Sequence, residues 1–230
     1  MRGAIFDLDG TLADTAADLL GAANAVLAPL GLPLLELARD KSYAGRGGRS
    51  MIRRSLSMMA VSPGEIEADV IAADLYPGLL RAYEGRLAEE TRLFDGVVGC
   101  LDALEATGWK LGVCTNKPER LAVMLLDSLG VLDRFGAVLG ADSLAIRKPD
   151  PEHLFETARR SGARPDLCVM LGDTQTDLLT ARAAGVPCVL TSFGFAEEPL
   201  DELTPDAVVS HFGEIAPVLE RLCPLPAKTA

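Results

Sequence analysis

The chain has 230 residues, 49% of them hydrophobic, and a formal net charge of -11 at pH 7. This length can bury a sizeable core with a second domain inserted in the first, while the acidic balance and the lack of a long uncharged apolar stretch argue against nucleic acid or a membrane as partner. Five cysteines with no close CxxC pair are typical of small buried side chains in a reducing compartment, so we expect a cytoplasmic protein.

The first apolar run, Ala-Ile-Phe at residues 4–6, predicts a strand buried on both faces, and Asp7 and Asp9 follow it. Unpaired buried charges are costly, so these carboxylates need a cation. They lie two positions apart, which puts both on one side of an extended chain. Hard oxygen ligands of this kind suit Mg²⁺, which often shares its shell with a phosphate. Taken alone, the segment has an alternative: Asp9 and Gly10 could simply begin a turn.

Residues 15–90 have helical patterns and no strand pattern. Asp14 and Thr15, with Asp18 three residues on, are typical of a capping-box start of a helix that ends at Gly31. The polar, glycine-rich residues 40–49 predict a loop. Two further helices are expected at 50–59 and 65–87, the second interrupted at Pro77-Gly78.

From residue 94 the chain alternates between helical and strand patterns. Strands are expected at 110–114, 137–140, 167–171, 187–191 and 207–209, and helices at 97–107, 118–129, 151–161, 176–184 and 214–222. This alternation predicts an α/β fold, a Rossmann-like doubly wound parallel sheet with helices on both faces. The helical block interrupts it, so we expect a core domain of residues 1–14 and 91–230 with a helical cap domain of residues 15–90.

Polar residues follow three of the predicted strands: Asp7 and Asp9, Thr115 and Asn116, and Asp173. Ligands of such sheets bind outside the carboxyl ends of the strands. We therefore expect the aspartates to converge on one point. Asp177 lies four residues beyond Asp173, so it could face the same way or simply place a favourable charge near a helix start.

Two further segments offer groups that could bind an anion. Thr115 and Asn116 provide a hydroxyl, an amide and a backbone N–H, although the same residues could only cap the helix that begins at Pro118. Lys148 lies in a non-periodic Arg-Lys-Pro-Asp-Pro loop. It is either an ordinary surface lysine or the cation that a site with three acids needs in order to admit a dianion.

Together these segments resemble the four ordered motifs of the haloacid dehalogenase superfamily. The motifs are Asp7-Leu8-Asp9-Gly10-Thr11, Thr115-Asn116, Lys148-Pro149 and Gly172-Asp173-Thr174-Gln175-Thr176-Asp177. A helical insertion after the first motif resembles the superfamily's cap of the first type. The phrases around Asp14-Thr15, Thr115-Asn116-Lys117-Pro118 and Gly140-Ala141-Asp142 are similar to those of its phosphoglycolate phosphatase branch.

The resemblance implies roles for these positions. Asp7 would be the nucleophile that forms an aspartyl-phosphate, and a ligand of Mg²⁺. Asp9 would offer its backbone carbonyl to the metal, while its side chain protonates the leaving oxygen and then activates water. Asp173 would complete the metal ligands, with Asp177 in support. Thr115, Asn116 and Lys148 would hold the phosphoryl group. Dehalogenases of the superfamily lack the acid at Asp9, so a phosphatase is implied.

The resemblance thus implies a Mg²⁺-dependent phosphatase of a small phosphomonoester, with 2-phosphoglycolate the first candidate, acting as a monomer or homodimer. Alternatives are a phosphatase for a nucleotide, sugar phosphate or pyrophosphate, a β-phosphoglucomutase-like phosphomutase, or a phosphate-binding protein without turnover. Arg46 and Arg49 in the cap, with Arg53 and Arg54 nearby, could meet a substrate carboxylate or form a solvated basic face.

Overall fold

The chain is described by a computed structural model, which covers residues 1–195 and 200–224. It divides into two compact units: unit 1 comprises Met1–Ala13 and Leu93–Ala230, and unit 2 comprises Asp14–Arg92. These boundaries lie within two residues of the expected ones. The first boundary falls inside the short strand β2 (Ala13–Asp14), and the second falls inside the short strand β3 (Arg92–Leu93). These two strands form a two-stranded sheet.

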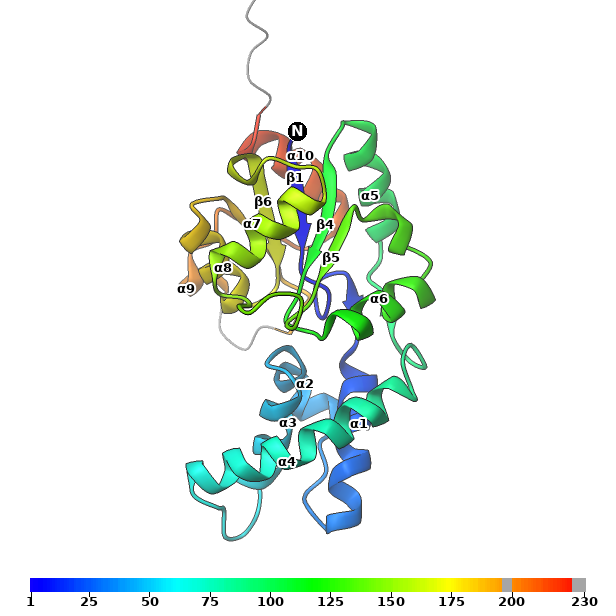
Figure 1. Cartoon of the computed structure of the whole chain (residues 1–230), viewed down its shortest axis with the longest axis vertical. Coiled ribbons are helices and arrows are strands. Elements are labelled where there is room, and N and C mark those ends of the chain that lie inside the picture. The colour runs from blue at the N-terminus through cyan, green and yellow to red at the C-terminus, as the bar shows by residue number, and fades with distance from the viewer. Residues whose placement is uncertain (196–199, 225–230) are drawn as a thin grey trace, which may run out of the picture. The chain divides into compact units, whose positions relative to one another are not determined.

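Unit 1 is built on a parallel sheet of six strands in the order β5-β4-β1-β6-β7-β8 (Figure 1). In that order the strands are Ala137–Leu139, Lys110–Cys114, Gly3–Phe6, Cys168–Gly172, Cys188–Thr191 and Ala207–Val209. The chain adds strands on one side of β1 and later on the other. The predicted doubly wound α/β fold is therefore confirmed, and β1 lies at the point where the strand order reverses.

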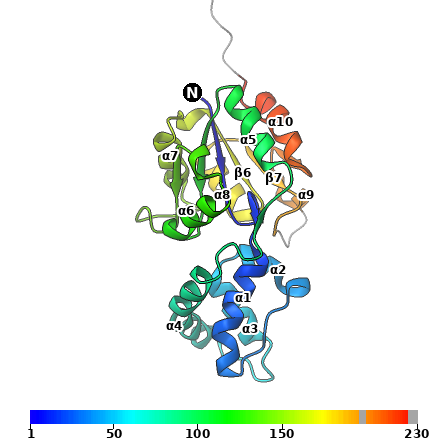
Figure 2. The same ribbon diagram turned by 90° about the vertical axis from the view of Figure 1, so that its right-hand side faces the viewer.

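Helices cover both faces of this sheet. They are α5 (Val97–Ala106), α6 (Glu119–Ser128), α7 (Pro151–Arg160), α8 (Gln175–Ala184), α9 (Leu200–Leu203) and α10 (Ile215–Leu222). Helices α7 and α8 pack on one face, and α5 and α10 on the other (Figure 2). On the first face, Ile5 and Met170 of the sheet pack with Leu154 and Leu178 of the helices, all nearly inaccessible to solvent. This burial of both sheet faces explains why the strands read as continuous apolar runs.

Unit 2 is helical, with α1 (Ala16–Leu27), α2 (Leu37–Gly45), α3 (Gly48–Ser57) and α4 (Glu65–Glu84). The loop predicted at residues 40–49 is wrong, because most of it belongs to α2. Asp40 explains the difference: its buried carboxylate accepts hydrogen bonds from Glu36 N, at the start of the helix, and from Arg39 and Arg54. The polar segment is thus held in a helix by an ion pair with α3.

The predicted interruption at Pro77-Gly78 is also wrong, since α4 runs through both residues. Helix α4 packs against α1 and α3, and tertiary packing of this kind outweighs the loss of one backbone hydrogen bond at a proline. A Cβ atom on Gly78 would lie 3.2 Å from Val26 Cγ1. The glycine therefore lets α4 approach α1 closely and does not mark a turn.

The expected capping box at the start of α1 does not form. Thr15 precedes the helix without making a side-chain cap hydrogen bond. The carboxylate of Asp18 instead accepts hydrogen bonds from Thr91 N at 2.9 Å, Thr91 Oγ1 at 2.7 Å and Glu90 N. Asp18 thus fastens the end of unit 2 to its first helix.

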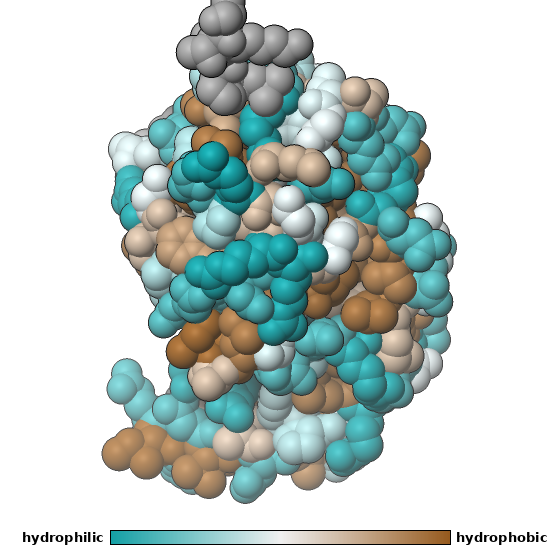
Figure 3. Space-filling view, turned by 45° about the horizontal axis from the view of Figure 1, so that its top comes forward, coloured by the Kyte–Doolittle hydropathy of each residue, from teal (hydrophilic) through white to brown (hydrophobic). Residues whose placement is uncertain are grey.

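The face drawn in Figure 3 is mostly hydrophilic, with separate apolar patches. The described residues include apolar side chains that remain exposed, such as Val61 and Ile66. Among the helices of the described ranges, none combines the length and the hydropathy needed to cross a membrane.

Candidate active site

Three neighbouring strands, β4, β1 and β6, end level with one another, and each is followed by a predicted site residue. Phe6, the last residue of β1, pairs with Val113 of β4 and with Leu171 of β6. Just beyond this level, the Asp7 backbone N–H donates to Leu171 O at 2.8 Å. The parallel register thus brings Asp7 and the residues after β4 and β6 to the same edge of the sheet.

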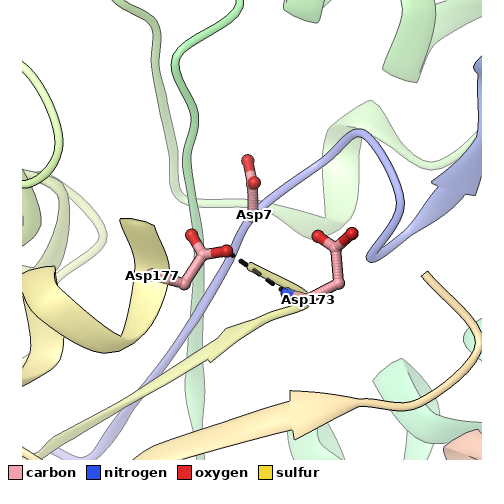
Figure 4. A group of neighbouring side chains, drawn as sticks. All are labelled: Asp7, Asp173 and Asp177. Carbon is pink, nitrogen blue, oxygen red and sulfur yellow. Dashed lines mark hydrogen bonds between the residues drawn. The ribbon is translucent and has the colours of Figure 1, made fainter. Parts of the chain in front are cut away.

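Three carboxylates gather there, from Asp7, Asp173 and Asp177 (Figure 4). One oxygen of each lies within 4.8 Å of the other two. Asp173 and Asp177 are fully buried and Asp7 is nearly so. In Figure 4 the three side chains extend toward the same side of the ribbon, two of them from the residues directly after β1 and β6 and the third from α8. This group is called the carboxylate cluster below.

Asp173 is fixed from two sides. Thr11 Oγ1 donates to its Oδ1 at 2.9 Å, and the Phe195 backbone N–H donates to its Oδ2 at 2.7 Å. Two glycines make room for it: a Cβ atom on Gly10 would lie 2.2 Å from Asp173 Oδ2, and one on Gly194 would lie 2.3 Å from Asp173 Cβ. Gly10 also has a φ of +80°, which favours glycine. The two backbone segments around Asp173 therefore need residues without side chains.

Asp177 does two things at once. Its Oδ2 accepts hydrogen bonds from Thr174 Oγ1 and from the backbone N–H groups of Thr174 and Asp173, which completes a capping box at the start of α8. Its Oδ1 accepts a 2.6 Å hydrogen bond from Lys148 Nζ. Asp177 is thus both a charge at a helix start and a member of the carboxylate cluster, as each of the two interpretations of the sequence expected.

Lys148 is a cation in direct contact with the carboxylate cluster. Its Nζ lies 2.6 Å from Asp177 Oδ1 and 3.1 Å from Asp7 Oδ1. The side chain is buried, so it is not the ordinary surface lysine of the alternative interpretation. Burial would lower the pKa of Lys148, but Asp177 and Asp7 outweigh it and hold the pKa above its ordinary value. The ammonium is therefore charged and contacts two of the three acids.

One ammonium does not balance three buried carboxylates. Burial raises the pKa of Asp7 to about 6, with Asp177 and Asp9 adding to the rise and Lys148 opposing it. Burial, then Asp177 and Asp7, raise the pKa of Asp173 well above its ordinary value. The cluster thus holds more negative charge than the protein around it neutralises. An oxygen-only donor set with this excess charge fits a divalent cation such as Mg²⁺.

The Asp9 side chain lies outside the carboxylate cluster. It accepts hydrogen bonds from Lys117 Nζ at 2.9 Å to Oδ1 and 3.2 Å to Oδ2. The sequence pattern assigned no role to Lys117, although it follows Thr115 by two residues in the same loop. The expected part of Asp9 in metal binding concerned its backbone carbonyl and stays a prediction.

Thr115 and Asn116 do not cap the following helix. Pro118 takes the position before α6 and makes no side-chain cap hydrogen bond. Thr115 Oγ1 instead accepts from Lys117 N at 3.2 Å, and Asn116 Nδ2 donates to Lys148 O at 3.1 Å. The bond from Asn116 links two of the predicted phosphate-binding segments.

The cap residues Arg46 and Arg49 belong to unit 2. The guanidinium of Arg46 lies 5.7 Å from the centre of the Tyr43 ring, and that of Arg49 lies 5.2 Å from the centre of the Tyr76 ring. Arg54 pairs with buried Asp40 and so has a structural partner. A role for Arg46 and Arg49 in substrate choice stays a prediction.

Comparisons with known proteins show which sequences this chain is similar to. The sequence model of a family described as haloacid dehalogenase-like hydrolase matches residues 4–191. A protein named phosphoglycolate phosphatase from Agrobacterium fabrum is 39% identical over 216 residues, covering 94% of this chain and 91% of that protein. One of the same name from Mesorhizobium japonicum is 40% identical over 95% of each chain.

Solved structures show the same fold. The crystal structure of a predicted phosphoglycolate phosphatase from Haemophilus somnus has a TM-score of 0.82 with 27% sequence identity. The match covers 95% of this chain and 97% of that one.

Proposed function

The chain belongs to the haloacid dehalogenase-like hydrolase family, and on this premise we propose that it hydrolyses 2-phosphoglycolate with Mg²⁺, through an aspartyl-phosphate on Asp7. The chain is a phosphatase, because its curated relatives at 39% and 40% identity are named as phosphatases. The observation that carries the proposed chemistry is the carboxylate cluster with Lys148 beside Asp7. The substrate rests on the relatives at 39% and 40% identity that are named for it.

In the proposed site, Asp7 and Asp173 would hold Mg²⁺ with their side chains, Asp9 would add its backbone carbonyl, and Asp177 would support them. When bound, Mg²⁺ would neutralise charge on the phosphoryl oxygens. Thr115, Asn116 and Lys148 contribute the remaining donors, a hydroxyl, an amide and an ammonium. Asn116 and Lys148 are already linked by a hydrogen bond, so these donors can act as one binding surface.

In the first half of the reaction, an Asp7 carboxylate oxygen attacks phosphorus. A bond forms between this oxygen and phosphorus, the bond from phosphorus to the ester oxygen breaks, and Asp9 gives a proton to the departing oxygen. In the second half, water attacks phosphorus, Asp9 accepts a proton from the water, and the Asp7 carboxylate is released together with inorganic phosphate. The hydrogen bond from Leu8 N to Asp7 Oδ1, at 2.7 Å, fixes the orientation of the nucleophile.

A screen of phosphomonoesters with the full chain and Mg²⁺ tests the proposal. We expect kcat/KM for 2-phosphoglycolate to exceed that for nucleotides and sugar phosphates by at least about tenfold. Asp7→Asn should abolish turnover, while Asp166→Asn, which changes an exposed acid paired with Arg164, should not. A stronger response to another phosphate would refute the substrate. Transfer of the phosphoryl group to a sugar hydroxyl instead of water would establish the phosphomutase alternative. The cytoplasmic location and the monomer or homodimer state stay predictions.

A further inference from the structure

The loop after β4 places a buried lysine against the proposed acid and base. The side chain of Lys117 is 3% exposed and that of Asp9 is 17% exposed. Nζ of Lys117 bonds both carboxylate oxygens of Asp9, at 2.9 and 3.2 Å. Lys117 lies in the loop after β4, and Asp9 lies in the loop after the neighbouring strand β1. Both residues of this pair therefore belong to unit 1.

This second cation differs from Lys148 in position. Lys148 contacts Asp7 and Asp177, the acids around the proposed phosphoryl site, and Lys117 contacts the acid proposed to serve the leaving oxygen. The Lys117 ammonium is thus held in the core beside the acid proposed to serve the leaving oxygen. A positive charge at this position favours a leaving group that carries a negative charge.

The chemistry of 2-phosphoglycolate supplies such a charge beside the leaving oxygen. Asp9 must come within about 3 Å of that oxygen to transfer a proton, so Lys117 Nζ lies within about 6 Å of it. In 2-phosphoglycolate a carboxylate is joined to the ester oxygen through a single CH₂ group. A carboxylate oxygen about 3 Å from the ester oxygen can therefore reach hydrogen-bond distance of the ammonium.

We propose that Lys117 determines substrate specificity by binding the carboxylate of 2-phosphoglycolate. The inference rests on the proposed function and names the core residue that selects its substrate. Lys117 thereby distinguishes an acidic leaving group from a neutral alcohol.

Two inert ligands isolate this recognition from catalysis. In 3-phosphonopropionate a CH₂ group replaces the ester oxygen of 2-phosphoglycolate, and propylphosphonate has the same chain length without the carboxylate. Neither is hydrolysed through a P–O ester bond, so Asp9 has no proton to transfer. Dissociation constants are measured by calorimetry with Mg²⁺ present, for the full chain and for Lys117→Met.

The wild-type chain should bind 3-phosphonopropionate about 10- to 100-fold more tightly than propylphosphonate, as expected for a hydrogen bond between charged groups. In Lys117→Met the two ligands should bind about equally, and binding of inorganic phosphate should change little. Lys117→Arg, which keeps the charge, should retain part of the preference. Lys110→Met is the matched control, because Lys110 begins the strand that Lys117 follows, and it should keep the wild-type ratio.

A role limited to holding Asp9 would leave the ratio of the two dissociation constants unchanged in Lys117→Met, and that result would overturn the proposal. Equal binding of both ligands by the wild-type chain would overturn it as well. The proposed function fails on a different observation, namely no turnover of 2-phosphoglycolate by the wild-type chain under conditions in which another phosphomonoester is hydrolysed.

Discussion

Replacing the proposed nucleophile should stabilise the metal-free protein while destroying its activity. Burial raises the pKa of Asp7 to about 6 from an ordinary value of 3.8. At 1.36 kcal/mol per pKa unit, this difference corresponds to about 3 kcal/mol. Because the folded protein holds this proton more tightly than the unfolded chain, stability is lost as pH rises from about 4 to about 6 and stays lost above that range.

In Asp7→Asn this cost is absent, and Lys148 keeps its contact with Asp177. We therefore expect the variant, in excess chelator at pH 7, to be more stable than the wild-type chain by up to about 3 kcal/mol. For a chain of this length that raises Tm by about 6–12 °C. Thermal unfolding followed by circular dichroism at pH 7 and at pH 4 provides the measurement, and the difference should nearly vanish at pH 4.

Asp166→Asn is the control, since Asp166 is exposed and should show no comparable pH-dependent gain. An Asp7→Asn variant that is no more stable than the wild-type chain at pH 7 in chelator would refute the reasoning. A gain of the same size at pH 4 would show that its cause is not the charge of Asp7.

Three other predictions concern the metal, the proposed acid and base, and unit 2. Mg²⁺ at about 100 times its dissociation constant should stabilise the wild-type chain by about 2.7 kcal/mol, which thermal unfolding records as a rise in Tm. In Asp173→Asn most of this rise in Tm should disappear, and an equal rise in both proteins would contradict the metal assignment. Asp9→Asn should lower kcat by roughly 10²–10⁴-fold, because it removes the proposed acid and base. It should keep the Mg²⁺-dependent rise in Tm, because the Asp9 side chain lies outside the carboxylate cluster. A near wild-type kcat in steady-state kinetics would argue against Asp9 as the acid and base. Burial opposes the ionisation of Asp40, but hydrogen bonds from Arg39, Glu36 N and Arg54 lower its pKa to about 2. The ionised Asp40 carboxylate therefore stabilises the fold above about pH 4, and this stabilisation is lost as pH falls toward 2. Asp40→Asn should lower the free energy of unfolding at pH 7 by about 1 kcal/mol, after allowance for screening at its partly exposed arginine partners. An acid-unfolding curve with the same midpoint and slope as that of the wild-type chain would contradict this.

Much of the core fold follows from periodicity in the sequence. The strand runs of unit 1 are apolar because both faces of the sheet are buried, and they alternate with amphipathic helices. Unit 2 was harder to predict, because α2 depends on the contact between Asp40 and Arg54, which are 14 positions apart. The Pro77-Gly78 pair has the composition of a turn, and only the close approach of α4 to Val26 explains the glycine inside a helix.

The carboxylate cluster could be anticipated because the residues after parallel strands meet at one edge of a sheet. Its supporting contacts could not. The hydrogen bond to Asp173 from Phe195 comes from a backbone N–H, which any residue but proline could supply, so it leaves no mark on the sequence. The pairing of Lys117 with Asp9 joins residues 108 positions apart, and only the relative placement of β1 and β4 brings them together.

The central claim is that a side-chain oxygen of Asp7 receives the phosphoryl group. Rapid acid quench of the full chain during turnover of ³²P-labelled 2-phosphoglycolate with Mg²⁺, followed by peptide mapping, tests it directly. We expect acid-trapped label on the peptide that contains Asp7 and none in Asp7→Asn. Turnover at an undiminished rate by Asp7→Asn, or label confined to another residue, would contradict it.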